Sequence, residues 1–113
     1  MNLTFPEAYA LTLLLETPVY WFFLRKYCPA WKAIAASLIL NTITLPVVWF
    51  VLPPILISNY LLYFAIAELF AWLAEAAMVK LAFSELSLKK ALAVALAANA
   101  VSAAAGLAIA FFP

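Results

Sequence analysis

Two sets of oxygen-bearing side chains recur along the chain at a matched spacing. Each set consists of a glutamate, an asparagine and a hydroxyl residue: Glu16, Asn41 and Thr44 in the first set, and Glu75, Asn99 and Ser102 in the second. Carboxylate, amide and hydroxyl oxygens suit hard cations such as Na⁺, Ca²⁺ and Mg²⁺, and carboxylates also bind protons. The two sets therefore predict a binding site for a proton or a small cation.

The composition around these side chains is typical of a membrane protein. Of the 113 residues, 71% are hydrophobic and 10% are charged, with a formal net charge of +1. Average soluble domains have about 45–50% apolar and about 25% charged residues, and a small domain hides only about 60–70% of the surface that its unfolded chain exposes. The composition predicts a polytopic helical protein in a lipid bilayer. It excludes a soluble enzyme, a disordered tail and a nucleic-acid binder.

The residues needed for common cofactors are missing. The chain has no His, one cysteine (Cys28) and one glycine (Gly106). Zinc, haem, iron–sulfur and dithiol sites need His or several Cys residues, and a phosphate-binding loop needs several glycines. We therefore expect no cofactor.

The basic residues divide the chain into apolar segments. They form two clusters: Arg25, Lys26 and Lys32, then Lys80, Lys89 and Lys90. A transmembrane helix needs about 20 mostly apolar residues. The clusters and the polar Ser58-Asn59 pair leave four such segments, 5–24, 33–52, 60–83 and 91–112. These segments are continuously apolar rather than alternating, which excludes a transmembrane barrel. The predicted fold class is an all-α integral membrane protein, a single domain over residues 1–113 that forms a bundle of four transmembrane helices.

The same clusters predict the orientation in the membrane. Loops rich in Lys and Arg stay in the cytoplasm, so residues 25–32 and 80–90 are predicted to be cytoplasmic, with both termini outside a multi-pass cell-membrane protein. The first segment is not typical of a signal peptide, because its positive charge follows the apolar run and Glu16 interrupts it. Four aromatic residues are interpreted as a belt at the inner interface: Tyr20, Trp21, Tyr27 and Trp31.

The two halves of the chain are predicted to be copies of one helical hairpin. The glutamates of the two sets are 59 residues apart and the asparagines 58 apart, so the halves match with one gap in the basic loop. The copies would cover residues 5–57 and 60–112. Because each copy holds two spans, both would have the same orientation. A pseudo-two-fold axis along the membrane normal would relate them, a parallel duplication known in some transporters.

The spacing also predicts the depth of the polar residues. Each glutamate lies 8 residues before the end of its span, and each asparagine lies 8 residues after the start of its span. All four are therefore expected about 12 Å from the cytoplasmic edge of the bilayer core. Glu68 lies on the same helix face as Glu75, about 10 Å further out, and is a third acidic candidate for the site. Pro46 is expected to kink its helix and to open a cavity beside Thr44.

These carboxyl groups need compensation inside a bilayer. An ionised side chain at the bilayer centre costs about 2.5–3.5 kcal/mol, and no Lys, Arg or His lies deep enough in the sequence to pair with a glutamate. We therefore expect the glutamates to be neutral or to share a proton, with Asn41 and Asn99 hydrogen-bonded to them.

Three functions fit this predicted fold. In the first, the chain is a small transporter or channel, either a homodimer or joined to a partner membrane subunit, in which Glu16 and Glu75 bind a proton or a small cation. The alternative is a non-catalytic scaffold or accessory subunit whose polar side chains specify helix packing. The third is an enzyme that acts on a lipid with a glutamate pair as acid and base. It is disfavoured because the chain has no His and no Asp.

Overall fold

The computed structural model describes residues 4–51 and 59–111, and over these residues the chain forms four long helices and no strand. They are α1 (Phe5–Leu24), α2 (Ala30–Pro46), α4 (Tyr60–Ala82) and α5 (Leu88–Phe111), and a short π-helical segment, η1 (Val47–Val51), continues α2. The all-helical prediction is confirmed. Helix α1 has the predicted bounds, whereas α2 and α5 each begin three residues earlier than predicted. The predicted helix ends at residues 52 and 112, and Ser58 of the predicted outer turn, lie outside the described residues.

Local sequence signals set the helix starts. Thr4 and Glu7 form a capping box at α1, in which the Glu7 carboxylate accepts from the Thr4 N–H at 2.9 Å and the Thr4 hydroxyl accepts from the Glu7 N–H at 3.4 Å. Pro29 directly precedes α2, where its missing N–H leaves no helical hydrogen bond unmade. The Ser87 hydroxyl accepts from the Lys90 N–H at 3.1 Å at the start of α5. Because of Pro29 and Ser87, α2 and α5 start within the basic segments, before the apolar runs from which the two helices were predicted.

The winding of the second helix changes at Pro46. Proline has no N–H, and its ring pushes against the carbonyl group four residues earlier. The helix widens into the π-helical segment η1 directly after Pro46. Tyr63 on α4 donates its hydroxyl to the carbonyl oxygen of Val48 at 2.7 Å, so a neighbouring helix satisfies a backbone group of this segment. The predicted disturbance at Pro46 takes the form of a widened turn.

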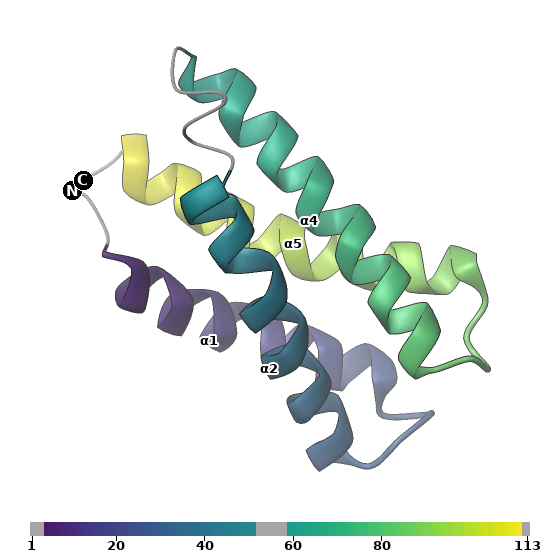
Figure 1. The fold of residues 1–113 in the computed structure, drawn as a ribbon. Coiled ribbons are helices and arrows are strands. Elements are labelled where there is room, and N and C mark those ends of the chain that lie inside the picture. The colour runs from purple at the N-terminus through teal and green to yellow at the C-terminus, as the bar shows by residue number, and fades with distance from the viewer. Residues whose placement is uncertain (1–3, 52–58, 112–113) are drawn as a thin grey trace.

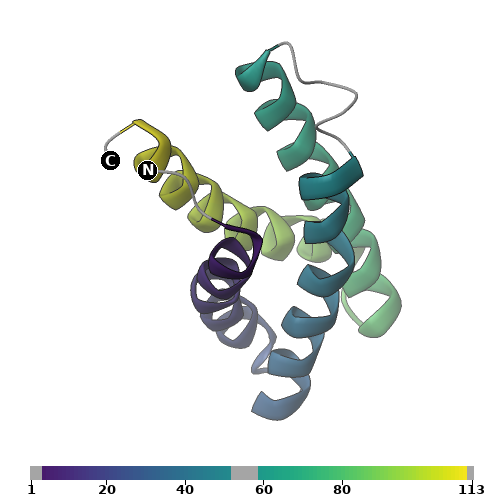
Figure 2. The same cartoon turned by 60° about the vertical axis from the view of Figure 1, so that its left-hand side comes forward.

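The helices pack as two hairpins whose loops lie at the same end of the molecule (Figure 1). Helix α1 packs on α2 and α4 packs on α5. The hairpins meet mainly through α1 and α5, with a smaller contact between α2 and α4, and Figure 2 shows this arrangement from a second side. The molecule measures 41 × 23 × 19 Å along its principal axes. Its long axis is close to the thickness of a bilayer with headgroups, about 40–45 Å.

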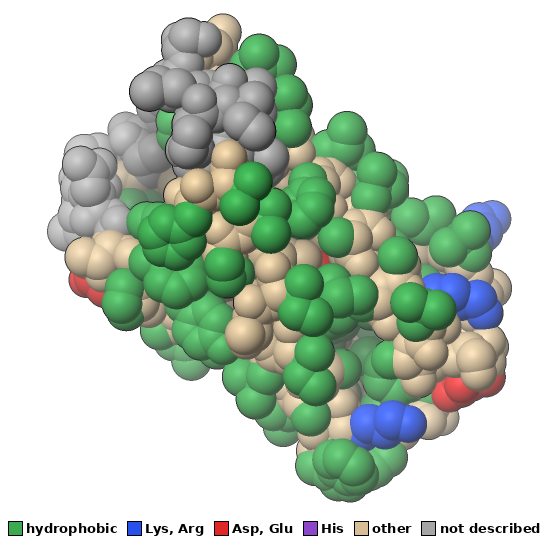
Figure 3. Space-filling view, viewed as in Figure 1, with side chains coloured by type: hydrophobic (Ala, Val, Ile, Leu, Met, Phe, Trp, Pro, Cys, Tyr) green, Lys and Arg blue, Asp and Glu red, His purple; other side chains and the backbone are tan. Residues whose placement is uncertain are grey.

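One end of the molecule is basic and closely packed. We call it the basic end: the loops 25–29 and 83–87 with the adjoining helix turns. The Lys and Arg side chains on the face shown in Figure 3 gather there. Seven side chains in its interior are at most 1% exposed: Tyr20, Leu24, Ala33, Val79, Phe83, Leu86 and Ala91. Lys80 ties the second loop to its helix by donating Nζ to the carbonyl oxygens of Ser84 and Leu86 at 2.7 and 2.6 Å. The described residues therefore pack the interior of the basic end closely.

Three helical segments are long and apolar enough to cross a membrane: Ala30–Val51, Tyr60–Ala82 and Leu88–Ile109. Large apolar side chains cover much of the surface, as Figure 3 shows, which is consistent with a membrane protein. Helix α1 is not among the three, although it has 20 residues. Two glutamates, two prolines and two threonines interrupt its apolar run, and it falls short of the hydropathy that marks the other three segments.

Candidate functional site

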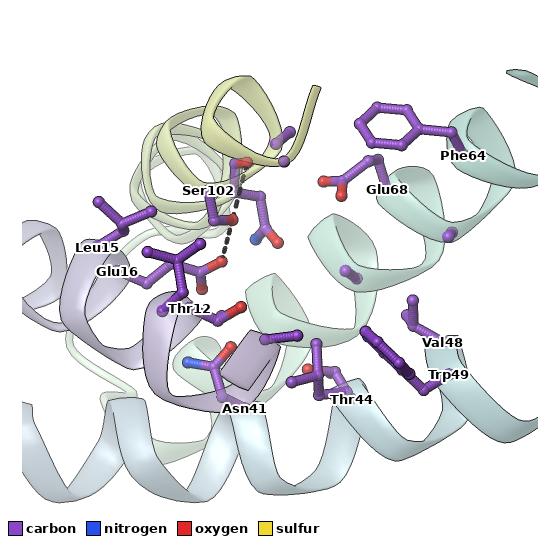
Figure 4. A pocket seen from close by; sticks show the side chains of 18 of the residues that line it. Thr12, Leu15, Glu16, Asn41, Thr44, Val48, Trp49, Phe64, Glu68 and Ser102 are labelled. Carbon is purple, nitrogen blue, oxygen red and sulfur yellow. Dashed lines mark hydrogen bonds between the residues drawn. The ribbon is translucent and has the colours of Figure 1, made fainter. Parts of the chain in front are cut away.

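A partly open cavity of about 780 Å³ lies between the helices. Its lining residues come from 8–16 of α1, 41–49 of α2 and η1, 60–75 of α4 and 99–109 of α5. On each helix the lining residue nearest the basic end is one of the predicted site residues: Glu16, Asn41, Glu75 and Asn99. These four residues form the floor of the cavity, part of which is labelled in Figure 4. The packed interior of the basic end lies beneath this floor.

Each floor glutamate accepts a hydrogen bond from the hairpin to which it does not belong. Ser102 on α5 donates to Oε2 of Glu16 on α1, the bond drawn as a dashed line in Figure 4. Thr44 on α2 donates to Oε2 of Glu75 on α4 at 3.3 Å. The two glutamates are 2% and 1% exposed. The predicted hydroxyl residues thus join the two hairpins through buried carboxyl groups.

The asparagine amides have different partners from those predicted. Nδ2 of Asn41 donates to the carbonyl oxygen of Ser37 at 2.9 Å, and Nδ2 of Asn99 donates to that of Ala95 at 2.8 Å. Both carbonyl groups lie one turn back in the same helix, within easy reach of a short polar side chain. Asn99 also lies beside the Glu75 carboxyl group, but the closest donors to the two carboxyl groups are hydroxyl groups. Asn41 and Asn99 contribute buried polar surface to the cavity floor.

Tyr20 belongs to the site, although the sequence pattern suggested the aromatic belt. Its side chain is 0% exposed, and its hydroxyl donates to Oε1 of Glu75 at 2.6 Å. A fully buried ring cannot form part of a belt at the membrane surface, so that interpretation is wrong for Tyr20. The sequence spacing could have predicted that Tyr20 faces the site, because Tyr20 lies four residues after Glu16 and residues four apart share one helix face.

The two floor glutamates differ in how completely they are paired. Both oxygens of Glu75 accept hydrogen bonds, one from Tyr20 and one from Thr44. In contrast, Oε1 of Glu16 is buried and has no hydrogen-bond partner among the described residues. No Lys or Arg is among the residues that line the cavity. Leaving a buried polar atom unpaired costs about 1–3 kcal/mol, so Oε1 of Glu16 is a favoured contact for a proton or a ligand.

Glu68 lines the same cavity at a second level. Its carboxyl group points into the cavity in Figure 4, and its side chain is half-buried. The hydrogen bonds that reach cavity carboxyl groups from described residues all go to Glu16 or Glu75. A smaller hollow of about 330 Å³ between α4 and α5 shares Glu68 and Asn99 with the cavity. Glu68 therefore presents an accessible carboxyl group beside an opening between two helices.

The acidic groups lie at two levels of the cavity. Within residues 4–51 and 59–111, no three acidic or cysteine side chains lie close enough together to hold a metal ion. The Glu16 and Glu75 carboxyl groups adjoin each other at the floor, whereas Glu68 lies at a second level of the cavity.

Comparisons with known proteins identify no relative. No family model, no curated protein and no solved structure matches the chain.

Proposed function

We propose that this protein is a small membrane transporter or channel in which Glu16 and Glu75 bind a proton or a small cation. The observation that carries the proposal is the cavity floor, where both carboxyl groups are at most 2% exposed and no Lys or Arg lines the cavity. An isolated ionised group is very costly in a medium of low dielectric constant. A buried carboxyl group without a basic partner therefore binds a proton or another cation.

The packed basic end makes the proposed path a gated one. Beneath the floor, Tyr20, Leu24 and Phe83 are each at most 1% exposed. A transporter that exposes its site to one side at a time needs such a seal, and so does a channel in its closed state. In this proposal the cation reaches the glutamates from the end opposite the basic end, and the seal opens later in the cycle.

The proposed architecture is a bundle of four transmembrane helices made of two parallel hairpin copies. Buried positions of α1 match buried positions 59 residues later, in α4 or directly after it, and buried positions of α2 match buried positions 58 residues later in α5. The pairs are Ala8 and Ala67, Glu16 and Glu75, Leu24 and Phe83, Ala33 and Ala91, Leu40 and Ala98, and Asn41 and Asn99. The Glu16–Ser102 bond corresponds in the same way to the Glu75–Thr44 bond. This pattern supports a pseudo-two-fold axis that passes between the carboxyl groups. Helix α1 is about 30 Å long at 1.5 Å per residue, which is enough for a fourth span.

The proposed orientation places the basic end in the cytoplasm. Loops rich in Lys and Arg are retained there, so residues 25–32 and 80–90 would be cytoplasmic and both termini outside. The cavity would then face the exterior. A single copy offers little room for a complete path, so we propose a homodimer or a complex with a partner membrane subunit. Two-fold symmetry is the commonest arrangement for such assemblies.

Removing the charge of the glutamates tests the proposed transport. The double substitution Glu16→Gln with Glu75→Gln keeps shape and hydrogen-bonding capacity but removes ionisation. In vesicles that contain the purified protein and a pH- or Na⁺-sensitive dye, we expect the ion flux of the double variant to fall to the level of empty vesicles. Its thermal melt in detergent should stay close to that of the wild type. Glu85→Gln is the matched control, because Glu85 is exposed at the basic end, and it should retain the flux.

A scaffold or accessory subunit is the second candidate, and the cross-hairpin hydrogen bonds favour it. The Ser102–Glu16 and Thr44–Glu75 bonds hold the hairpins together whether or not a cation binds. A scaffold should tolerate both Gln substitutions, because a neutral amide is easier to bury than an ionisable acid. Undiminished flux in the double variant would overturn the role of Glu16 and Glu75, and no ion flux from the wild type under a proton or Na⁺ gradient would favour the scaffold.

A further inference from the structure

We infer that the cavity binds a linear organic dication, a diamine or polyamine, with one ammonium group at Glu16 and another at Glu68. This inference rests on the proposed function, because it names the class of cation that the same cavity takes. It starts from the hydrogen bonds of the three cavity glutamates. Both oxygens of Glu75 are engaged by Tyr20 and Thr44. Glu16 keeps one buried oxygen without a described partner, and Glu68 presents its half-buried carboxyl group to the cavity. The free acceptors are therefore on Glu16 and Glu68.

The two acceptors lie at different depths. Glu68 precedes Glu75 by seven residues on α4, which is about 10 Å along the helix axis. Glu16 lies at the cavity floor with Glu75, so Glu68 lies about two helix turns along α4 above the level of the floor. A single ammonium ion or metal ion cannot contact both, since a charged hydrogen bond spans only about 2.8 Å. A chain with a cationic group at each end can contact both carboxyl groups.

The walls and the volume of the cavity also fit an organic ligand. Trp49, Tyr63 and Phe64 line the cavity near the level of Glu68 and beyond it. Aromatic rings attract ammonium groups through their faces and pack against methylene groups. The volume of about 780 Å³ falls within the range of about 300–1,000 Å³ that is typical of sites for organic molecules. An inorganic cation would leave most of this space to water.

The test compares a diamine with a monoamine of equal chain length. We would titrate cadaverine and n-pentylamine into the purified protein in detergent and measure binding by calorimetry. We expect cadaverine to bind about tenfold or more tightly, because its second ammonium group adds a charged hydrogen bond. Glu68→Gln should reduce the affinity for cadaverine to that for n-pentylamine and leave n-pentylamine binding unchanged. Glu16→Gln should weaken the binding of both amines, and Glu85→Gln should weaken neither.

Each outcome of this test has a defined meaning. Equal affinity for the two amines, or wild-type cadaverine binding in Glu68→Gln, would overturn the inference. No binding of either amine by a protein that still carries a proton or Na⁺ flux would also overturn it, while the proposed transport function would stand. Cadaverine binding that depends on Glu16 and Glu68, without flux under any gradient, would support the dication site and overturn transport.

Discussion

The hydrogen bond between Tyr20 and Glu75 gives the sharpest test of the site, through the substitution Tyr20→Phe. The two side chains are 0% and 1% exposed, and the oxygen–oxygen distance is 2.6 Å. That distance is within the range of about 2.5–2.7 Å for a hydroxyl that donates to a carboxylate. Phenylalanine keeps the ring and its packing, so the substitution removes the donor and leaves Oε1 of Glu75 unpaired.

The expected loss depends on the charge of Glu75. A hydrogen bond to a charged group contributes about 1.5–3 kcal/mol and a neutral bond about 1 kcal/mol. For the neutral or proton-sharing Glu75 expected here, Tyr20→Phe should therefore lower the free energy of unfolding by about 1 kcal/mol, and for an ionised Glu75 by about 2 kcal/mol or more. Denaturant titration in detergent measures this loss. A double-mutant cycle with Glu75→Gln then isolates the coupling energy between the two side chains.

Tyr27→Phe is the matched control for this prediction. The Tyr27 ring is half-buried, but its hydroxyl accepts from Nζ of Lys90 at 2.9 Å in an exposed hydrogen bond, so loss of that hydroxyl should change stability by less than about 0.5 kcal/mol. If Tyr20→Phe is no more destabilising than Tyr27→Phe, or if the cycle shows no coupling, Tyr20 does not hold Glu75 and the geometry of the floor is refuted.

Two further predictions concern the basic loop and the helix contacts. Burial raises the pKa of the Cys28 thiol, and Lys32 opposes this effect. Since the thiolate is the reactive form, labelling of Cys28 by a membrane-impermeant maleimide should be faster at pH 9 than at pH 7. Labelling should occur only in vesicles or cells that expose the basic end. Ready labelling of intact cells from outside would refute the proposed orientation. Ala98 is 0% exposed in α5, so Ala98→Leu should cost about 1–3 kcal/mol by overpacking in a denaturant titration. The control Ala93→Leu adds the same atoms at an exposed position of α5 and should leave the free energy of unfolding nearly unchanged. If the two substitutions were equally destabilising, the helix packing around Ala98 would not be close.

The sequence by itself determined the helices and the common level of the polar residues along them. Charged clusters interrupt the apolar runs, and helices are the only spanning structure that continuous apolar runs allow. Depth along a helix follows from the rise per residue alone. Counting residues from the basic clusters therefore put Glu16, Asn41, Glu75 and Asn99 at one level. The same four residues are those nearest the basic end in the lining of the cavity.

The start of α5 shows where counting residues was too coarse. The apolar run predicted a start at residue 91, but the Ser87 hydroxyl begins the helix earlier by accepting from the Lys90 N–H. A cap depends on one hydrogen bond at a single residue, and that bond is not visible in the average polarity of a segment.

Only the tertiary structure decided which side chains pair. These helices are apolar on nearly all sides, so no single apolar face fixes the rotation of each helix about its own axis. The sequence therefore left open which face of each helix is turned inward. Packing turns Tyr20 toward Glu75, 55 residues away in the chain, and Ser102 toward Glu16, 86 residues away. It also directs both asparagine amides to their own helices and leaves one oxygen of Glu16 without a described partner. These pairings depend on the rotation and crossing of separate helices, which the rise per residue does not determine.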